Sequence, residues 1–224
     1  MRSHLAAVLC FVAVGTYSVG ARAAEGDHYV NYSMEVSVPI TAALFGLAFS
    51  AEFYKKNYAP KRCRWCVHNP VDESVRKVLS WNYSEHKTAH MISNIVLASI
   101  PIMGLAELAF FNDEVRSPTR AEWNGFATAS GVYAETLAIS LALNQVSKLI
   151  FMRRRPYARS YRYRDDDDAN VSFYSGHTST AFVLAVAAAT LNDMKGGSYR
   201  GLTWSVNILM ATMVGYLRIS VDKH

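Results

Sequence analysis

Five long apolar segments, separated by polar connections, run through most of this chain. None of them shows the alternation of apolar and polar residues that a half-buried strand requires. Turn and capping residues, such as Asn69-Pro70 and Gly196-Gly197, lie in the connections. The pattern predicts an all-α protein, a bundle of about five long helices. The expected helices cover residues 36–53, 90–111, 126–151, 177–191 and 202–219.

The same segments raise the question of a membrane. Hydrophobic residues make up 51% of the chain and charged residues only 18%, which is more apolar than an ordinary soluble domain. Segment 90–111 contains one acid, Glu107, and is long enough to cross a hydrocarbon core of about 30 Å. Segment 126–151 contains Glu135 and Lys148, and ionisable groups at membrane depth usually face a bundle interior or mark a functional site. We expect a membrane-embedded bundle, with a soluble or membrane-associated bundle as the alternative.

The first residues have the pattern of a signal peptide. Arg2 precedes an apolar run, and the small residues Ala21 and Ala23 occupy the positions that signal peptidase recognises. We expect residues 1–23 to be removed, with an uncleaved anchor as the alternative. Residues 24–224 then form a single helical-bundle domain without internal repeats.

Two cysteines remain after such a cleavage, Cys63 and Cys66 in the sequence CRWC. No second pair completes a tetrahedral zinc site, so no metal site is expected. A redox-active pair would need a thioredoxin-like strand and helix around it, which the sequence lacks. A local disulfide in an oxidising compartment is the favoured interpretation.

A basic stretch follows the third apolar segment. Lys148 and Arg155 are seven residues apart, so a continuous helix would place them on nearly the same face, about 10 Å apart along the axis. Pro156 is expected to end that helix at Arg155. A guanidinium offers a planar fork that matches phosphate oxygens, and the formal net charge of +5 suits an anionic partner.

The remaining cations of this stretch have two open interpretations. They could attract an anionic lipid surface or acidic substrate, or they could pair with the acids 165–168 in a solvated loop. Solvation is the expected state of the four acids themselves. The cations concerned are Arg153, Arg154, Arg159, Arg162 and Arg164.

Two further stretches contain candidate site residues. Ser175 is a good N-cap, Gly176 allows close approach to the backbone, and His177 lies in the first helical turn. Free N–H groups there attract an anion, and a histidine there is a candidate proton donor. Arg218 closes the last apolar segment and His224 follows six residues later, so the two side chains converge only if the chain turns between them. An ordinary basic helix end is the alternative.

Together these stretches resemble the three-part signature of the type 2 phosphatidic acid phosphatase superfamily, which includes lipid phosphate phosphatases, bacterial acid phosphatases and vanadium haloperoxidases. The family usually has Pro where this chain has Tyr174, and Ser where it has Leu217. Its third motif continues beyond the histidine to an aspartate. We therefore expect this chain to be truncated within the third motif, without a sixth helix. The matching residues are Lys148, Arg155-Pro156, Ser175-Gly176-His177, Arg218 and His224.

The resemblance implies a mechanism without metal or cofactor. His224 would be the nucleophile that forms a phosphohistidine, and His177 would protonate the leaving oxygen and later activate water. The remaining signature residues would hold the phosphoryl oxygens. They are Lys148, Arg155, Ser175, Gly176 and Arg218.

Three functions compete at this point. The first is a phosphatase acting on a lipid, isoprenoid or small-molecule phosphate monoester. The second is a vanadate-dependent haloperoxidase, in which His224 would ligate vanadate. The third is an exported binding protein for anions or nucleic acid that uses residues 153–164, although export argues against nucleic acid as the partner. We expect a membrane protein whose site faces the periplasm, with a soluble periplasmic protein as the alternative. The topology signals conflict, because a cleaved signal and spanning of every segment would place the site in the cytoplasm.

Overall fold

A computed structural model describes residues 32–67, 69–110, 120–159, 166, 168–194 and 199–221. Over this part the protein is all-helical, and the expected bundle of about five long helices is confirmed. The predicted signal peptide, residues 1–23, lies outside the described residues. The long helices are α2 (Met34–Phe53), α5 (His86–Phe110), α6 (Arg120–Phe151), α7 (Gly176–Met194) and α8 (Arg200–Ser220).

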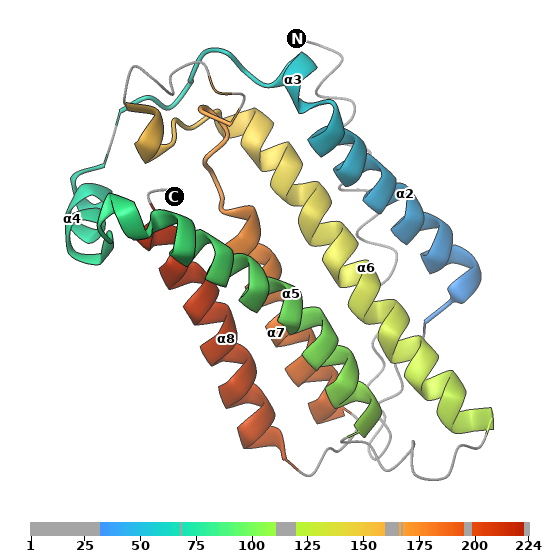
Figure 1. The fold of residues 1–224 in the computed structure, drawn as a ribbon. Helices are drawn as coiled ribbons and strands as arrows, with labels where there is room; N and C mark the ends of the chain where they lie inside the picture. Colours follow the sequence, from blue (N-terminus) through green and yellow to red (C-terminus); the bar gives the residue numbers. More distant parts are fainter. Residues whose placement is uncertain are drawn as a thin grey trace.

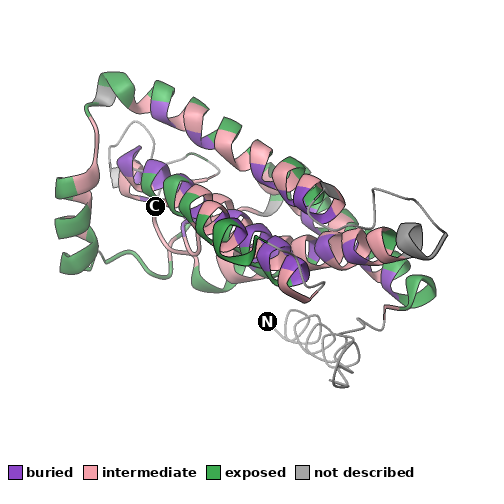
Figure 2. Cartoon of the chain, turned by 90° about the horizontal axis from the view of Figure 1, so that it is seen from below, coloured by how far each residue is buried: buried purple, intermediate pink, exposed green. Residues whose placement is uncertain are grey.

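The helices α5, α6, α7 and α8 form the bundle, with α7 in contact with the other three (Figure 1). The helix α2 packs along the outside of α6. The inner face of α7 consists mainly of small residues, and Ala181, Ala185 and Ala188 are buried there. Small side chains let helix backbones approach closely, which is the usual way in which helices associate in membranes. Figure 2 shows the buried positions facing the bundle interior and the exposed positions facing outward.

Two asparagines inside the bundle pair with polar side chains of neighbouring helices. Asn207 of α8 donates hydrogen bonds from Nδ2 to both carboxylate oxygens of Glu107 on α5, at 2.9 and 2.8 Å. Asn192 of α7 donates to Thr203 Oγ1 at 3.1 Å. A polar group buried without a partner costs free energy, so these contacts restrict the register of α5, α7 and α8.

Within the described part of the chain, four helices are long and apolar enough to cross a membrane, namely Met34–Phe53, His86–Ala109, Gly125–Phe151 and Arg200–Ser220. Large apolar side chains are exposed on their outer faces, for example Phe49 (58%), Ile102 (70%) and Leu209 (69%). An apolar outer surface of this kind is typical of contact with lipid. The structure therefore indicates a membrane-associated protein.

The connections at one end of the bundle contain the short helices and the 3-10 turns of the described residues. Between α2 and α5 lie α3 (Lys55–Tyr58), α4 (Pro70–Leu79) and the 3-10 turn Tyr83–Glu85. A second 3-10 turn, Pro156–Arg159, lies between α6 and α7. Because the helices alternate in direction, the end of α8 also lies here (Figure 1).

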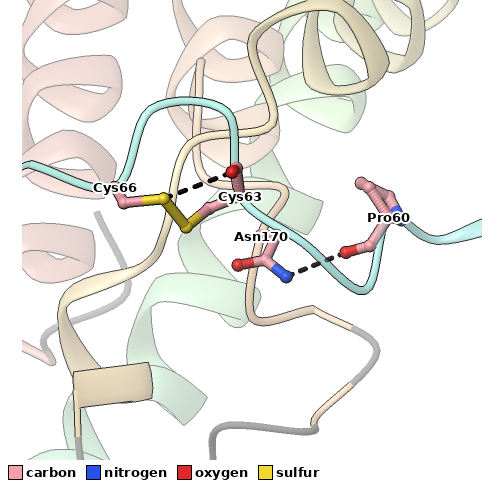
Figure 3. Close-up of a disulfide and its surroundings, with 4 residues drawn as sticks. All are labelled: Pro60, Cys63, Cys66 and Asn170. Carbon is pink, nitrogen blue, oxygen red and sulfur yellow. Dashed lines mark hydrogen bonds between the residues drawn. A yellow bond between two sulfur atoms is a disulfide. The ribbon is translucent and has the colours of Figure 1, made fainter.

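A disulfide stabilises this end of the molecule. Cys63 and Cys66 are joined in the connection after α3, with their Cα atoms 5.4 Å apart (Figure 3). Beside them, Asn170 Nδ2 donates a hydrogen bond to the carbonyl oxygen of Pro60 at 2.8 Å. The connection after α3 is thereby attached to the connection that precedes α7.

The packing of α5 on α6 makes a prediction about Gly104. A Cβ at Gly104 would lie 2.4 Å from the hydroxyl oxygen of Tyr133, a residue only 3% exposed. We expect Gly104→Leu to lower the free energy of unfolding by about 1–3 kcal/mol through overpacking. The measurement is SDS-induced unfolding in mixed micelles, followed by circular dichroism.

Gly46 provides the matched control, because a Cβ there meets no atom within 4 Å. Gly46→Leu makes the same chemical change in a helix and should leave stability unchanged or slightly raised. Equal losses from the two variants would contradict the close approach at Gly104.

Candidate active site

Two of the predicted site residues lie near the end of α6, namely Lys148 within the helix and Arg155 after it. Lys148 lies in its last turn, and the helix ends at Phe151. Met152 then has a φ of 45°, in the left-handed region that ends many helices. The prediction that the helix continues to Arg155 is therefore wrong. The chain instead pairs with the connection after α3, where Arg64 N donates to Met152 O and Arg154 N donates to Trp65 O, each at 3.1 Å.

Arg155 is held by the connection that precedes α7. Its backbone N–H donates to Ala169 O at 2.8 Å, and its Nη2 donates to Val171 O at 3.4 Å. The side chain is buried, and Nη2 lies 3.9 Å from Asp168 Oδ1. Arg155 thus points inward from a loop rather than from a helix face.

The start of α7 has the predicted capping arrangement. Ser175 Oγ accepts hydrogen bonds from the backbone N–H and the hydroxyl of Thr178, at 3.3 and 3.0 Å. A Cβ at Gly176 would lie 3.0 Å from Asn144 Oδ1 and 3.7 Å from Lys148 Nζ. A glycine is therefore needed for α7 to begin this close to α6. Asn144, which the sequence analysis did not identify, also donates to the carbonyl of Tyr174 at 2.8 Å.

His177 is oriented by α5. Its Nε2 lies 3.0 Å from Asn94 Oδ1, and Asn94 Nδ2 lies 3.4 Å from His90 Nδ1. Since a carbonyl oxygen only accepts, His177 Nε2 donates this bond and carries the proton in the neutral ring. Neither Asn94 nor His90 was predicted, because one Asn and one His in an apolar segment are no motif.

The surroundings of His177 oppose its protonation. Burial, followed by the nearby charges of Arg218, His90, Arg155 and Lys148, lowers its pKa to about 4. The histidine is therefore neutral at pH 7. Lys148 and Arg155 of the first signature motif, Arg218 of the third and His90 of α5 therefore lie near the imidazole of His177, which belongs to the second motif.

Arg218 is the most unusual of these groups. It lies in the last turn of α8 and is 4% exposed. Among the described residues, its Nε and Nη1 have no hydrogen-bond partner. A buried guanidinium with unpaired N–H groups is unfavourable, so an anion that accepts these bonds would bind here with a large gain. Lys148, Arg155 and Arg218 are called the cation cluster below.

Two carboxylates lie beside the cation cluster. Lys55 forms ion pairs with Glu52 (2.7 Å) and with Asp168. Burial raises the pKa of Asp168, but Arg155 and Lys55 outweigh it and the net pKa is lowered. Burial lowers the pKa of Lys55, but its partners Asp168 and Glu52 outweigh burial, and the net pKa of Lys55 is raised. The expectation of a fully solvated acidic run is therefore wrong for Asp168.

Among the other basic residues of this stretch, the side chain of Arg153 contacts groups outside the cation cluster. Arg153 pairs with Asp72 and lies 5.0 Å above the ring of Trp65. The predicted nucleophile His224 lies outside the described residues, as do Arg162 and Arg164. Over the part of the chain that the structure describes, no three His, Cys, Asp or Glu side chains are grouped as metal ligands.

The unpaired state of Arg218 makes a prediction about stability. Arg218→Met removes a buried charge and keeps an unbranched side chain. In phosphate-free detergent solution we expect this variant to unfold at a higher temperature than the parent, by about 1 kcal/mol or more in stability. Inorganic phosphate should raise the unfolding temperature of the parent and have no effect on the variant.

Arg200→Met is the control, because Arg200 lies at the other end of α8, is 59% exposed and pairs with Asp193. It should change stability little and preserve the response to phosphate. A lower unfolding temperature for Arg218→Met would show that Arg218 has a structural partner.

A second prediction concerns the titration of His177. In the free protein it should titrate near pH 4, and bound phosphate should raise this pKa by offsetting the surrounding cations. Because the folded pKa lies below the ordinary value of 6.5, the folded state should lose stability as the pH falls from about 6.5 to 4. The measurement is NMR of labelled histidine, assigned with His177→Gln. A titration near 6.5 that ignores phosphate would contradict the described environment.

The sequence was also compared with known protein families, curated proteins and solved structures. A family model described as the PAP2 superfamily matches residues 129–224. No curated protein and no solved structure gives a significant match to the chain. The matched range begins inside α6 and includes the cation cluster, Ser175, Gly176 and His177. The C-terminal part of this chain, residues 129–224, is therefore similar to the PAP2 superfamily.

Proposed function

We propose that this protein is a metal-independent phosphatase that hydrolyses phosphate monoesters, with lipid or isoprenoid phosphates as its substrate class. The supporting observation is the cation cluster beside a neutral histidine, in which Arg155 and Arg218 are buried and Arg218 has two unpaired donors. The match of residues 129–224 to the PAP2 superfamily supports a phosphatase or haloperoxidase-like activity. The apolar outer face of the four long helices supports a substrate that resides in lipid.

The cation cluster would bind the phosphoryl group. Lys148, Arg155 and Arg218 come from three separate elements, so they can contact different oxygens of one tetrahedral anion. Their fixed charges stabilise the charge on the transferring group without reorganisation of solvent. The first N–H groups of α7, starting at Gly176, add donors at the positive end of a helix dipole.

His177 would manage the proton of the leaving group. It is neutral in the free protein, and a bound phosphate dianion favours its protonated form by offsetting the cation cluster. The protonated ring can then donate to the leaving oxygen, and the neutral ring can afterwards accept a proton from water.

The covalent step is assigned from the family signature. His224 would attack phosphorus as the bond to the leaving oxygen breaks, and water would then displace the histidine and release phosphate. This assignment rests on the resemblance at Arg218 and His224, since His224 lies outside the described residues.

The site would face the exterior of the membrane, in the periplasm. The Cys63–Cys66 disulfide lies at the same end of the bundle as the cation cluster, because the backbone of residues 64 and 65 pairs with that of residues 152 and 154, and disulfides persist in oxidising compartments. Residues 55–64 lie at the same end of the bundle. We therefore assign this whole end to the exterior side of the membrane.

A prediction separates the cation cluster from the surrounding basic residues. In the native full-length protein, Arg155→Ala should lower kcat/KM for a phosphate monoester by about 10²-fold, because it removes a contact to the transferring group. Arg153→Ala is the matched control, two residues away, with its guanidinium on Trp65 and Asp72. It should change kcat/KM by less than about threefold.

Equal losses at the two positions would mean that the basic stretch acts as a diffuse positive field. Vanadate separates the enzyme classes in the same assay, because it should inhibit the phosphatase by occupying the cation cluster. Halide oxidation by the vanadate-loaded protein, without phosphatase activity, would overturn the proposal in favour of a haloperoxidase.

A further inference from the structure

We propose that α4 is a membrane-surface helix, which lies in the plane of the lipid headgroups with its valine face against the acyl chains. The helix spans Pro70–Leu79 and is the only amphipathic element among the described connections. The proposed partner is an anionic lipid surface rather than another protein.

The sequence of α4 produces one apolar face without a protein partner. Val71, Val75 and Val78 are spaced four and three residues apart, so they project from the same side. Their exposed fractions are 65%, 41% and 80%, and no residue of α4 is buried. Removal of each valine side chain from water is favourable. A helix of ten residues is marginal on its own, so this face needs an apolar surface to lie on.

The polar face of α4 is balanced by ion pairs. Glu73 pairs with Arg76 at 2.7 Å, and Asp72 pairs with Arg153. Both acids of the helix are therefore neutralised within the protein, whereas Lys77 is exposed. The preceding segment 54–67 contains five Lys or Arg residues and no acid. Its exposed cations, together with Lys77, suit the negative surface of an anionic membrane. They are Lys56, Lys61, Arg62 and Arg64.

The orientation of α4 fits a bilayer interface. The views in Figures 1 and 2 show α4 running across the ends of the long helices rather than along them. Four of those helices are candidate membrane spans, so an element that crosses their ends lies parallel to the membrane plane. Interfacial amphipathic helices adopt this geometry, with the apolar face buried in the headgroup region.

The contact between Trp81 and Tyr216 also indicates where the membrane–water interface lies. Trp81, two residues after α4, donates from its backbone N–H to Ser220 O at 3.0 Å and from its ring Nε1 to Tyr216 Oη at 2.9 Å. Tyr216 is 40% exposed. Trp and Tyr concentrate at membrane–water interfaces, so these rings place the last turn of α8, which contains Arg218, at headgroup depth.

The consequence is that α4 would hold the cation cluster at the depth of lipid phosphates. A phosphate group carried by a lipid would then reach Arg218 without leaving the bilayer surface. This consequence rests on the proposed function, whereas the membrane contact of α4 does not.

The contact is tested by spin labelling in the full chain reconstituted in vesicles of equal parts phosphatidylcholine and phosphatidylglycerol. Nitroxides are attached at Val75→Cys and, as the matched control on the polar face, at Lys77→Cys, with Cys10→Ser and the native disulfide kept oxidised. We expect the label at position 75 to be relaxed mainly by oxygen, which partitions into lipid, and the label at 77 mainly by a water-soluble nickel chelate.

Two results would overturn the proposal. Relaxation of the label at position 75 by the nickel chelate would place the valine face in water. Protection of that label from both reagents would mean that protein covers it, as in a contact with a second copy or another chain.

A kinetic arm tests the consequence separately. The triple variant Val71→Thr, Val75→Thr and Val78→Thr keeps the branched side-chain shape while removing apolar surface. It should lower kcat/KM for phosphatidic acid in vesicles by roughly threefold to tenfold and leave hydrolysis of water-soluble p-nitrophenyl phosphate unchanged. An equal effect on both substrates would reject the role of α4 in substrate access. Absence of hydrolysis of either substrate by the parent protein would reject the proposed function and leave the labelling result standing.

Discussion

Repulsion among three neighbouring cations, two of them buried, is the constraint on which this end of the structure depends. Lys148, Arg155 and Arg218 converge near His177 although like charges in a poorly solvated interior destabilise one another. The long helices overcome this repulsion because small residues on α7 allow close packing along their whole length. Glu52 and Asp168, joined through Lys55, supply part of the missing negative charge. The remaining imbalance is the property that makes the site receptive to an anion.

The site is built from helix ends and loops rather than from helix faces. Gly176 lets α7 begin against Lys148, and Met152 turns the chain out of α6 so that Arg155 approaches from a separate direction. Three cations on one helix face would form a row, whereas cations from three directions can surround a tetrahedral ion. Asn94 and His90 complete the arrangement by fixing the proton of His177 on Nε2.

The sequence was sufficient to predict the elements whose signals are local. Apolar segments without alternation predicted five long helices, and Ser175-Gly176 predicted the start of α7. Prediction failed where the outcome depends on a distant partner. Pro156 suggested that the helix ends at Arg155, but pairing of residues 152–154 with Arg64 and Trp65 ends it at Phe151. Asp168 resembled a solvated acid because Lys55, its partner, lies more than a hundred residues earlier in the chain.

The pairing of the 152–154 segment with Arg64 and Trp65 also bears on how this domain can be divided. The family signature falls within residues 129–224, so that range might be treated as a portable unit. Arg155, however, is directed by a backbone that residues 64 and 65 hold in place, and His177 is oriented by Asn94. A chimera that transplanted only the signature-bearing range into another scaffold would carry the proposed phosphate ligands and leave behind the residues that orient them. The structural unit that orients these side chains is therefore larger than the matched range, and it begins no later than Arg64.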